Sequence, residues 1–283
     1  MPEPEKLSPV QFDRFRDFIY RQSGIRVDAS KTTLVSNRIR RRLRAGDFAG
    51  FDAYYKHLTS PQGAAELEQF LDAITTNETH FFRTPNHFDW FRGDFLTEVL
   101  LKYRRGERPA ELRVWSAACS TGEEPYSLAI CAAENSLRMK DWKISIVGTD
   151  ISEAVLKEAR QAIYRKRSLD EVSPVQLKRY FDALPESESW QVRPAIRELV
   201  EFRWHNLMEP LRLPPFDCIF IRNVLIYFDR ESKQAVIRNL FQALAPGGYL
   251  VVGPSEGIYD MLGDFVKKSA FLYQKPELGR SSP

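Results

Sequence analysis

Apolar positions in the first quarter of the chain recur at helical spacing. Phe12, Phe15 and Ile19 form one stripe behind Ser8-Pro9-Val10-Gln11, a helix start with an N-cap and a capping box, and Gly24 can end that helix. The same spacing predicts further helices over residues 31–45, 51–58 and 64–74. Because no strand pattern interrupts these helices, we expect an all-α N-terminal domain over residues 1–75.

After residue 90, short apolar and β-branched runs alternate with helical patterns. The runs predict strands near 112–115, 144–147, 217–221 and 249–252, with closing strands between 265 and 273. Helical patterns occupy 87–103, 123–133, 152–159 and 231–244. This alternation is typical of a parallel sheet covered by helices, so residues 91–276 predict an α/β, Rossmann-like domain followed by a tail at 277–283.

Two stretches depart from this alternation. Residues 164–202 contain a capped helix, Ser173 to Phe181, and short alternations such as Trp190-Gln191-Val192-Arg193, which predict an inserted antiparallel β-subdomain. Pro246-Gly247-Gly248 predicts a turn just before the strand at 249–252.

The connection between the two predicted domains, residues 76–90, has an unusual composition for a linker. Polar residues alternate with Phe81 and Phe82, and Arg83 follows just before the break at Pro85. This pattern indicates a segment folded over a ligand. A buried interdomain connector is the alternative.

The candidate ligand site is the turn after the first predicted strand. Small residues from Ser116 to Gly122 let a ligand approach the backbone closely, at the start of the following helix. Glu123 and Glu124 would repel a pyrophosphate, so a cationic ligand with an amino group, such as S-adenosylmethionine, fits better than a dinucleotide. Asp150 ends the second predicted strand, where a carboxylate can accept from both hydroxyls of a ribose. The alternative for the glutamates is that they complement the helix dipole.

Five arginines without an intervening acid mark the second predicted helix. Arg40, Arg41 and Arg44 lie opposite its apolar stripe, with Arg38 and Arg42 at the flanks. A solvated helix face is one interpretation, although such faces usually mix both signs of charge. The other is an acidic partner, either nucleic acid or a carboxylate-rich protein surface, since the arginine fork pairs with both.

Composition narrows the class of protein further. The net charge is only +3 and 43% of residues are apolar, which suits an ordinary globular protein. The three cysteines and four histidines lack the spacing of a disulfide framework or a metal site. No signal segment or apolar run near 20 residues is present, so we expect a cytoplasmic protein without membrane insertion and without a metal.

Several long motifs in fixed order carry a resemblance. The segments TTNETHFFR, SAACSTGEEPYSLAI, TDIS, RNVLIYFD and GGYLVVGPSE together resemble the chemotaxis receptor methyltransferases, the CheR family. These are S-adenosylmethionine-dependent protein-glutamate O-methyltransferases. The resemblance extends over nearly the whole chain. It implies a class I (Rossmann-like) methyltransferase domain with a small antiparallel β-subdomain, preceded by an all-α N-terminal domain.

The resemblance also implies roles for individual residues. Arg83 and Tyr227 match the pair nearest the transferred methyl group. Residues that match cofactor contacts are Asn77, Thr79, Arg83, Glu124, Asp150, Asn206, Leu207, Arg222 and Asn223. The arginines Arg38, Arg40, Arg41, Arg42 and Arg44 match the basic helix that docks on acidic cytoplasmic helices of chemotaxis receptors.

The chemistry of the implied reaction agrees with what the sequence lacks. A glutamate side chain is already anionic at pH 7, so its methylation needs no general base, and no catalytic dyad is visible.

Residues 184–189, which correspond to a glycine-rich loop that binds a receptor C-terminal pentapeptide in some relatives, are short, acidic and free of glycine. We therefore expect no pentapeptide tethering. Two other functions are possible: a nucleic-acid methyltransferase and a non-enzymatic cofactor sensor. The first is disfavoured, because enzymes that methylate base amines usually have an Asn/Asp-Pro-Pro-aromatic motif after the central strand, where this chain has RNVLIY.

Overall fold

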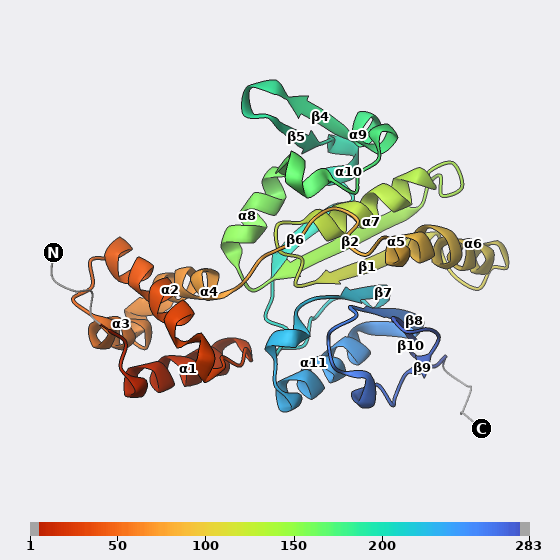
Figure 1. The fold of residues 1–283 in the computed structure, drawn as a ribbon. Coiled ribbons are helices and arrows are strands. Elements are labelled where there is room, and N and C mark those ends of the chain that lie inside the picture. The colour runs from red at the N-terminus through yellow and green to blue at the C-terminus, as the bar shows by residue number, and fades with distance from the viewer. Residues whose placement is uncertain (1–5, 278–283) are drawn as a thin grey trace.

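A seven-stranded sheet forms the centre of the computed structural model, which describes residues 6–277 (Figure 1). Its strand order is β6-β2-β1-β7-β8-β10-β9. The strands are β1 (Glu111–Ala117), β2 (Lys143–Asp150), β6 (Val200–Trp204), β7 (Phe216–Ile221), β8 (Leu244–Val252), β9 (Val266–Lys267) and β10 (Leu272–Gln274). The first five are parallel, and β10 runs antiparallel to both β8 and β9. Residues 278–283 of the predicted tail lie outside the described residues.

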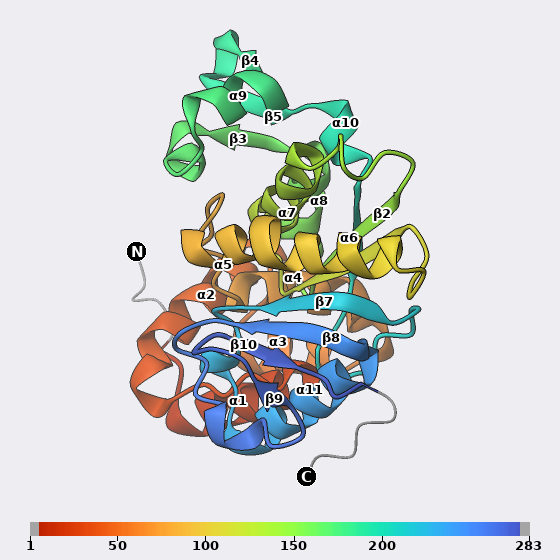
Figure 2. The same ribbon diagram turned by 90° about the vertical axis from the view of Figure 1, so that its right-hand side faces the viewer.

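Helices cover both faces of this sheet (Figure 2). They are α5 (Pro85–Trp90), α6 (Leu96–Arg104), α7 (Glu123–Glu134) and α8 (Glu153–Gln161) on one side and α11 (Arg230–Ala243) on the other. Along β7 the side chains alternate between the two layers: Cys218 and Phe220 join one core cluster, and Ile219 and Ile221 join the other. The all-apolar run in the sequence therefore reflects a strand buried on both faces.

Residues 6–75 contain four α-helices with a core of their own. These are α1 (Pro9–Ser23), α2 (Thr32–Ala45), α3 (Phe51–Leu58) and α4 (Ala64–Ile74). The predicted start of α1 is confirmed, because the Ser8 side chain accepts from the Gln11 backbone N–H and the capping box closes. Gly24 ends the helix with φ 73°, in the left-handed region that favours glycine.

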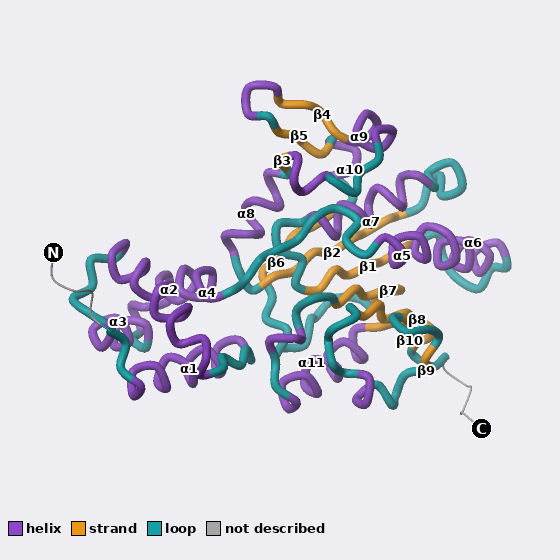
Figure 3. The backbone as a smooth tube through the Cα atoms, in the orientation of Figure 1, coloured by secondary structure: helices purple, strands orange, loops and turns teal. Residues whose placement is uncertain are grey.

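The small β-subdomain is present but shorter than the sequence suggested. It contains β3 (Ile163–Arg165), β4 (Phe181–Leu184) and β5 (Ser189–Val192) in an antiparallel sheet, with the short helices α9 (Pro174–Tyr180) and α10 (Pro194–Arg197). Figure 3 shows this sheet apart from the large one. Residues 200–202, predicted to belong to the insertion, instead pair with β2 as part of β6. Alternating apolar residues alone could not distinguish the two sheets.

One further prediction was wrong, and another gains a detail. The sheet register jumps from Phe216↔Leu244 to Cys218↔Tyr249, so Pro246-Gly247-Gly248 bulges out within β8 and is not a turn before it. The helical segment predicted from His87 to Tyr103 is confirmed: α5 starts at Pro85, and a π-helical turn, Phe91–Phe95, joins it to α6. Both differences are local adjustments of backbone hydrogen bonding that side-chain periodicity does not report.

Candidate active site

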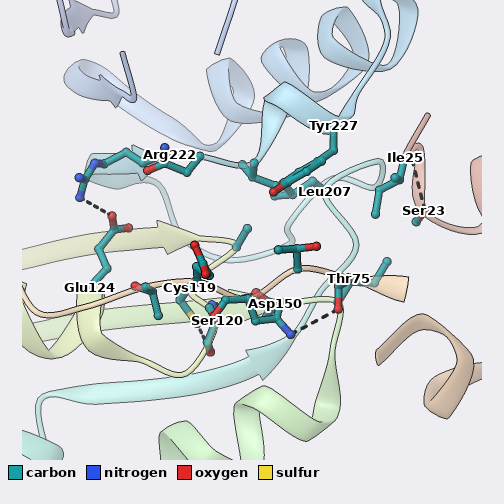
Figure 4. A pocket seen from close by; sticks show the side chains of 18 of the residues that line it. Ser23, Ile25, Thr75, Cys119, Ser120, Glu124, Asp150, Leu207, Arg222 and Tyr227 are labelled. Atoms are coloured by element: carbon teal, nitrogen blue, oxygen red, sulfur yellow. Dashed lines mark hydrogen bonds and ion pairs between the residues drawn. The ribbon is translucent and has the colours of Figure 1, made fainter. Parts of the chain in front are cut away.

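The site lies where the strand order reverses direction. From β1 the chain proceeds to β2 and β6 on one side and to β7 and β8 on the other, so the β1/β7 border is the switch point of the sheet. In open α/β sheets this is where ligands bind, beyond the carboxyl ends of the strands. A pocket opens here, with Arg222, Leu207 and Tyr227 on one side and Asp150, Ser120 and Cys119 on the other (Figure 4).

The pocket collects the residues that the sequence predicted for the cofactor. Asn77, Thr79, Arg83, Glu124, Asp150, Asn206, Leu207, Arg222, Asn223 and Tyr227 all line it. They come from the interdomain linker and from the segments after β1, β2, β6 and β7. Their proximity is a finding, whereas the role of each in binding or catalysis remains a prediction.

The turn after β1 has an unusual backbone. Ala118 and Ser120 have φ 59° and 50°, and Gly122 has φ 93°. Non-glycine residues in this region are uncommon and cluster at functional sites. A Cβ on Gly122 would lie 2.8 Å from the Ala159 Cβ, so glycine is needed for both conformation and space. The turn therefore brings its backbone close to the pocket, as its small residues suggested.

Asp150 anchors this turn. Its Oδ2 accepts the Ser120 backbone N–H at 2.9 Å, and its Oδ1 accepts the Ser152 N–H at 3.0 Å. Burial raises the pKa of the Asp150 carboxyl, and these backbone hydrogen bonds partly oppose that effect. Each carboxylate oxygen retains a lone pair, so Asp150 can still accept hydrogen bonds from a diol in the pocket.

The two glutamates at the start of α7 have different environments. Glu124 faces the pocket but is already paired: its Oε2 accepts from Arg222 Nη1 at 2.9 Å and its Oε1 from Ser116 Oγ at 2.7 Å. Glu123 is buried, accepts from Thr121 Oγ1 at 2.7 Å and does not line this pocket. The pocket therefore carries less negative charge than the sequence predicted, because Arg222 pairs with Glu124 and Glu123 does not line the pocket.

The linker crosses the pocket as a strap, residues 77–83. The Phe81 and Phe82 backbone N–H groups donate to the Ser168 carbonyl and to Ser127 Oγ, each at 2.9 Å, and both rings are buried. Arg83 Nη1 donates to the Glu78 carbonyl at 2.9 Å, and the Arg83 carbonyl accepts from the Arg222 guanidinium. The strap thus unites the two interpretations of the sequence, since its aromatic residues are buried as a connector and its polar residues face the pocket.

The helical domain supplies pocket residues that the sequence did not reveal. Ser23 and Ile25, at the end of α1, line the pocket, and the Arg26 N–H donates to the Tyr227 carbonyl at 2.8 Å. Asn206 Nδ2 donates to the Gln22 carbonyl at 2.8 Å, so this predicted cofactor contact also joins the domains. These contacts bridge about 200 positions of sequence, and no local pattern signals them.

The predicted arginine ridge on α2 is divided. Arg41 and Arg44 are exposed and Arg40 is partly exposed. Arg42 forms an ion pair with Glu66 at 2.8 Å, and Arg38 donates to the Ile74 carbonyl and to Thr76 Oγ1. Glu66 lies on α4, 24 positions away, so helical periodicity could not identify it as a partner.

The pocket fits S-adenosylmethionine. The buried carboxylate of Asp150 can accept hydrogen bonds from hydroxyl groups of a ligand, and Ile25, Leu207 and Phe228 give the pocket apolar surface. Within residues 6–277 no group of His, Cys, Asp or Glu side chains could hold a metal ion. In the same part of the chain no helix has the length and apolarity needed to cross a membrane. The fold and the pocket together define a class I methyltransferase.

Comparison with known proteins identifies the family. Residues 11–75 match the model described as CheR methyltransferase, all-alpha domain, and residues 77–271 match CheR methyltransferase, SAM binding domain. The chain therefore belongs to the CheR methyltransferase family and uses S-adenosylmethionine. It is 39% identical to a chemotaxis protein methyltransferase of Salmonella typhimurium, over 94% of this chain and 90% of that one. It is 37% identical to the chemotaxis protein methyltransferase of Escherichia coli, over 96% and 93%, and to chemotaxis protein methyltransferase 1 of Pseudomonas aeruginosa, over 89% and 92%.

Proposed function

We propose that this enzyme transfers a methyl group from S-adenosylmethionine to glutamate side chains in the cytoplasmic domain of chemotaxis receptors, giving glutamate methyl esters. The names of the relatives point to chemotaxis. The observation that carries the proposal is that Arg83 and Tyr227 line one pocket with Asp150 and Glu124, in a domain attached to a basic helix. An arginine and a tyrosine beside the methyl donor suit an anionic acceptor.

The acceptor carboxylate needs orientation rather than activation. When bound, S-adenosylmethionine supplies an electrophilic methyl group on a positively charged sulfur. A glutamate with a pKa of about 4.3 arrives as the carboxylate at pH 7, so no residue has to remove a proton. We assign Arg83 and Tyr227 to orienting this carboxylate by hydrogen bonds, and the strap 77–83 to limiting access of water.

The thiol in the pocket is unsuited to nucleophilic catalysis. Cys119 is fully buried, and burial together with nearby Asp150 and Glu124 raises the pKa of its thiol well above the ordinary value. It therefore stays protonated at neutral pH, and a protonated thiol is a weak nucleophile. This supports direct transfer to the acceptor and disfavours a covalent methyl-cysteine intermediate.

Docking is assigned to the exposed part of α2. Arg41 and Arg44 are exposed to solvent and Arg40 is partly exposed, whereas Arg38 and Arg42 make the internal contacts described above. A carboxylate-rich receptor helix complements this surface, and charge complementarity of this kind mainly affects association. Arg38 and Arg42 then serve to hold the basic helix in place.

The proposal is tested with radiolabelled S-adenosylmethionine and purified receptor cytoplasmic domain. We expect incorporation of label that base releases as methanol, as from a carboxyl ester. Arg83→Ala and Tyr227→Phe should each lower kcat, whereas Arg41→Ala/Arg44→Ala should raise the KM for the receptor and reduce its dependence on salt. Lys140→Ala, an exposed cation between α7 and β2, is the matched control and should change neither. Base-stable label, or transfer to RNA or DNA with a steep salt dependence, would refute the proposal.

A further inference from the structure

The segment after β8 contains a buried acid that the proposed function does not use. Gly253-Pro254-Ser255-Glu256 ends with Glu256, whose exposed fraction is 0%. A buried carboxylate is costly unless charge partners or hydrogen bonds compensate it. The groups around Glu256 therefore indicate what it stabilises.

Backbone N–H groups of a single loop surround this carboxylate. Oε1 accepts from the Asn223 N–H, and Oε2 accepts from the Leu225 N–H at 2.8 Å. Burial raises the pKa of Glu256, and the N–H groups of Asn223, Leu225, Val224 and Ile226 oppose that rise. The loop 223–226 is thus wrapped around one side chain.

Neighbouring residues hold the backbone of Glu256 and leave room for its carboxylate. Lys233 Nζ, from α11, donates to the Glu256 carbonyl at 2.7 Å. A Cβ on Gly253 would lie 2.4 Å from Glu256 Oε1, so glycine there leaves room for the carboxylate. Glu256 also lies close enough to Arg222 to raise the pKa of its guanidinium, although burial lowers that pKa overall.

The loop held by Glu256 carries the candidate site. Arg222 precedes it, Asn223 has φ 59° within it, and Tyr227 follows it, and all three line the pocket. We propose that Glu256 is a positioning residue for methyl transfer: its carboxylate clamps the backbone of loop 223–226 and thereby places Asn223 and Tyr227. This inference rests on the proposed function for the role of Tyr227.

The test compares two carboxylate-to-amide changes at opposite edges of the sheet. Glu256→Gln keeps the shape but turns an NH₂ group toward a backbone N–H. Asp217→Asn is the matched control, because Asp217 Oδ2 accepts the Arg113 backbone N–H at 2.9 Å at the far end of β7. Hydrogen exchange of the loop amides, kcat and the receptor KM are measured for both variants.

For Glu256→Gln we expect faster exchange at 223–226 and a fall in kcat of roughly 10–100-fold, as for a misplaced catalytic group, with the receptor KM unchanged. Asp217→Asn should leave both loop exchange and kcat close to the parent values. Unchanged loop exchange or unchanged kcat in Glu256→Gln would overturn the inference. A fall in kcat that Asp217→Asn reproduces would also overturn it, because general destabilisation would then explain the loss.

A double-mutant cycle with Tyr227→Phe separates this inference from the proposed function. If Glu256 acts through Tyr227, the losses in kcat from Glu256→Gln and Tyr227→Phe are less than additive. If Tyr227→Phe itself lowers kcat, fully additive losses would show that Glu256 does not position Tyr227 and would overturn the inference. If Tyr227→Phe alone keeps full turnover, the catalytic assignment of Tyr227 fails; loosened loop amides with reduced kcat in Glu256→Gln would still support the clamp, acting through Asn223.

Discussion

The ion pair between Arg222 and Glu124 allows a quantitative prediction. Their side chains are 2% and 13% exposed, and Arg222 also donates to the Arg83 carbonyl of the strap. Arg222→Met removes the guanidinium, keeps an unbranched apolar side chain and leaves the Glu124 carboxylate buried without its cationic partner. Removing one member of a buried pair costs about 3–5 kcal/mol of unfolding free energy. At about 2–4 °C per kcal/mol, this corresponds to a loss of roughly 6–20 °C in Tm.

Thermal and urea unfolding of four proteins measures this effect: parent, Arg222→Met, Glu124→Gln and the double variant. The double variant should be more stable than Arg222→Met, because it no longer buries an unpaired carboxylate and Ser116 Oγ can still donate to the amide oxygen. Arg230→Met is the matched control, since Arg230 pairs with Asp260 at 2.6 Å with both side chains more than half exposed. An exposed pair of this kind contributes about 0–1 kcal/mol.

The result that would refute this reasoning is a double variant destabilised by the sum of the two single changes. Additivity would mean that Arg222 and Glu124 stabilise the protein independently and that the pair carries no coupling free energy. A loss in Arg222→Met no larger than that in Arg230→Met would contradict the assignment of burial as the cause.

Two more predictions concern the core and the domain interface. Burial, with a smaller contribution from Arg222, lowers the pKa of His87 to about 3 from its ordinary 6.5. Between these two values the unfolded protein binds a proton at His87 and the folded protein does not. The free energy of unfolding should therefore be unaffected by His87 above pH 6.5 and should fall as the pH drops toward 3. The slope should approach about 1.4 kcal/mol per pH unit in urea unfolding and shrink in His87→Gln; an equal slope in both would contradict this prediction. Gly24→Ala should lower the free energy of unfolding by about 1–2 kcal/mol, because residue 24 has a left-handed backbone that disfavours alanine. The loss should be larger still, because the new Cβ would lie 2.6 Å from the Met208 Sδ. Calorimetry should also find weaker S-adenosylhomocysteine binding in Gly24→Ala than in Gly106→Ala, a control with φ 72° and open space around the Cβ.

Local sequence signals predicted most helices and strands, because the start, the end and the buried face of each depend on residues close together in the sequence. The capping box at Ser8, the capped helix at Ser173 and the strand at 217–221 each appear in the structure where expected. The β6 strand was missed as a member of the main sheet, since pairing with β2 is a tertiary choice. The bulge at Pro246-Gly247-Gly248 was missed for a related reason, because glycine and proline mark irregular backbone without distinguishing a turn from a bulge.

The candidate site divides in the same way. Residues that follow strand ends, such as Asp150 and Arg222, could be placed at one edge of the sheet from topology alone. The ion-pair partners of the charged residues could not be predicted, because the partner of Glu124 lies 98 positions away, just after β7, and the partner of Arg42 lies on another helix. Sequence patterning therefore located the pocket but misjudged its electrostatics.

The contribution of the helical domain to the pocket has a thermodynamic consequence. The same space as Asp150 and Tyr227 is lined by Ser23 and Ile25, at the end of α1, and by residues 74–76, at the end of α4. A ligand that contacts both domains binds their docked arrangement better than a separated one, so it stabilises the interface by its differential affinity. If a partner binds α2 and favours the docked arrangement, it increases the affinity for the cofactor. By reciprocity, the cofactor increases the affinity for that partner by the same factor. Arg38 offers a physical connection for this coupling, because it extends from the basic helix to Ile74 and Thr76 at the edge of the pocket.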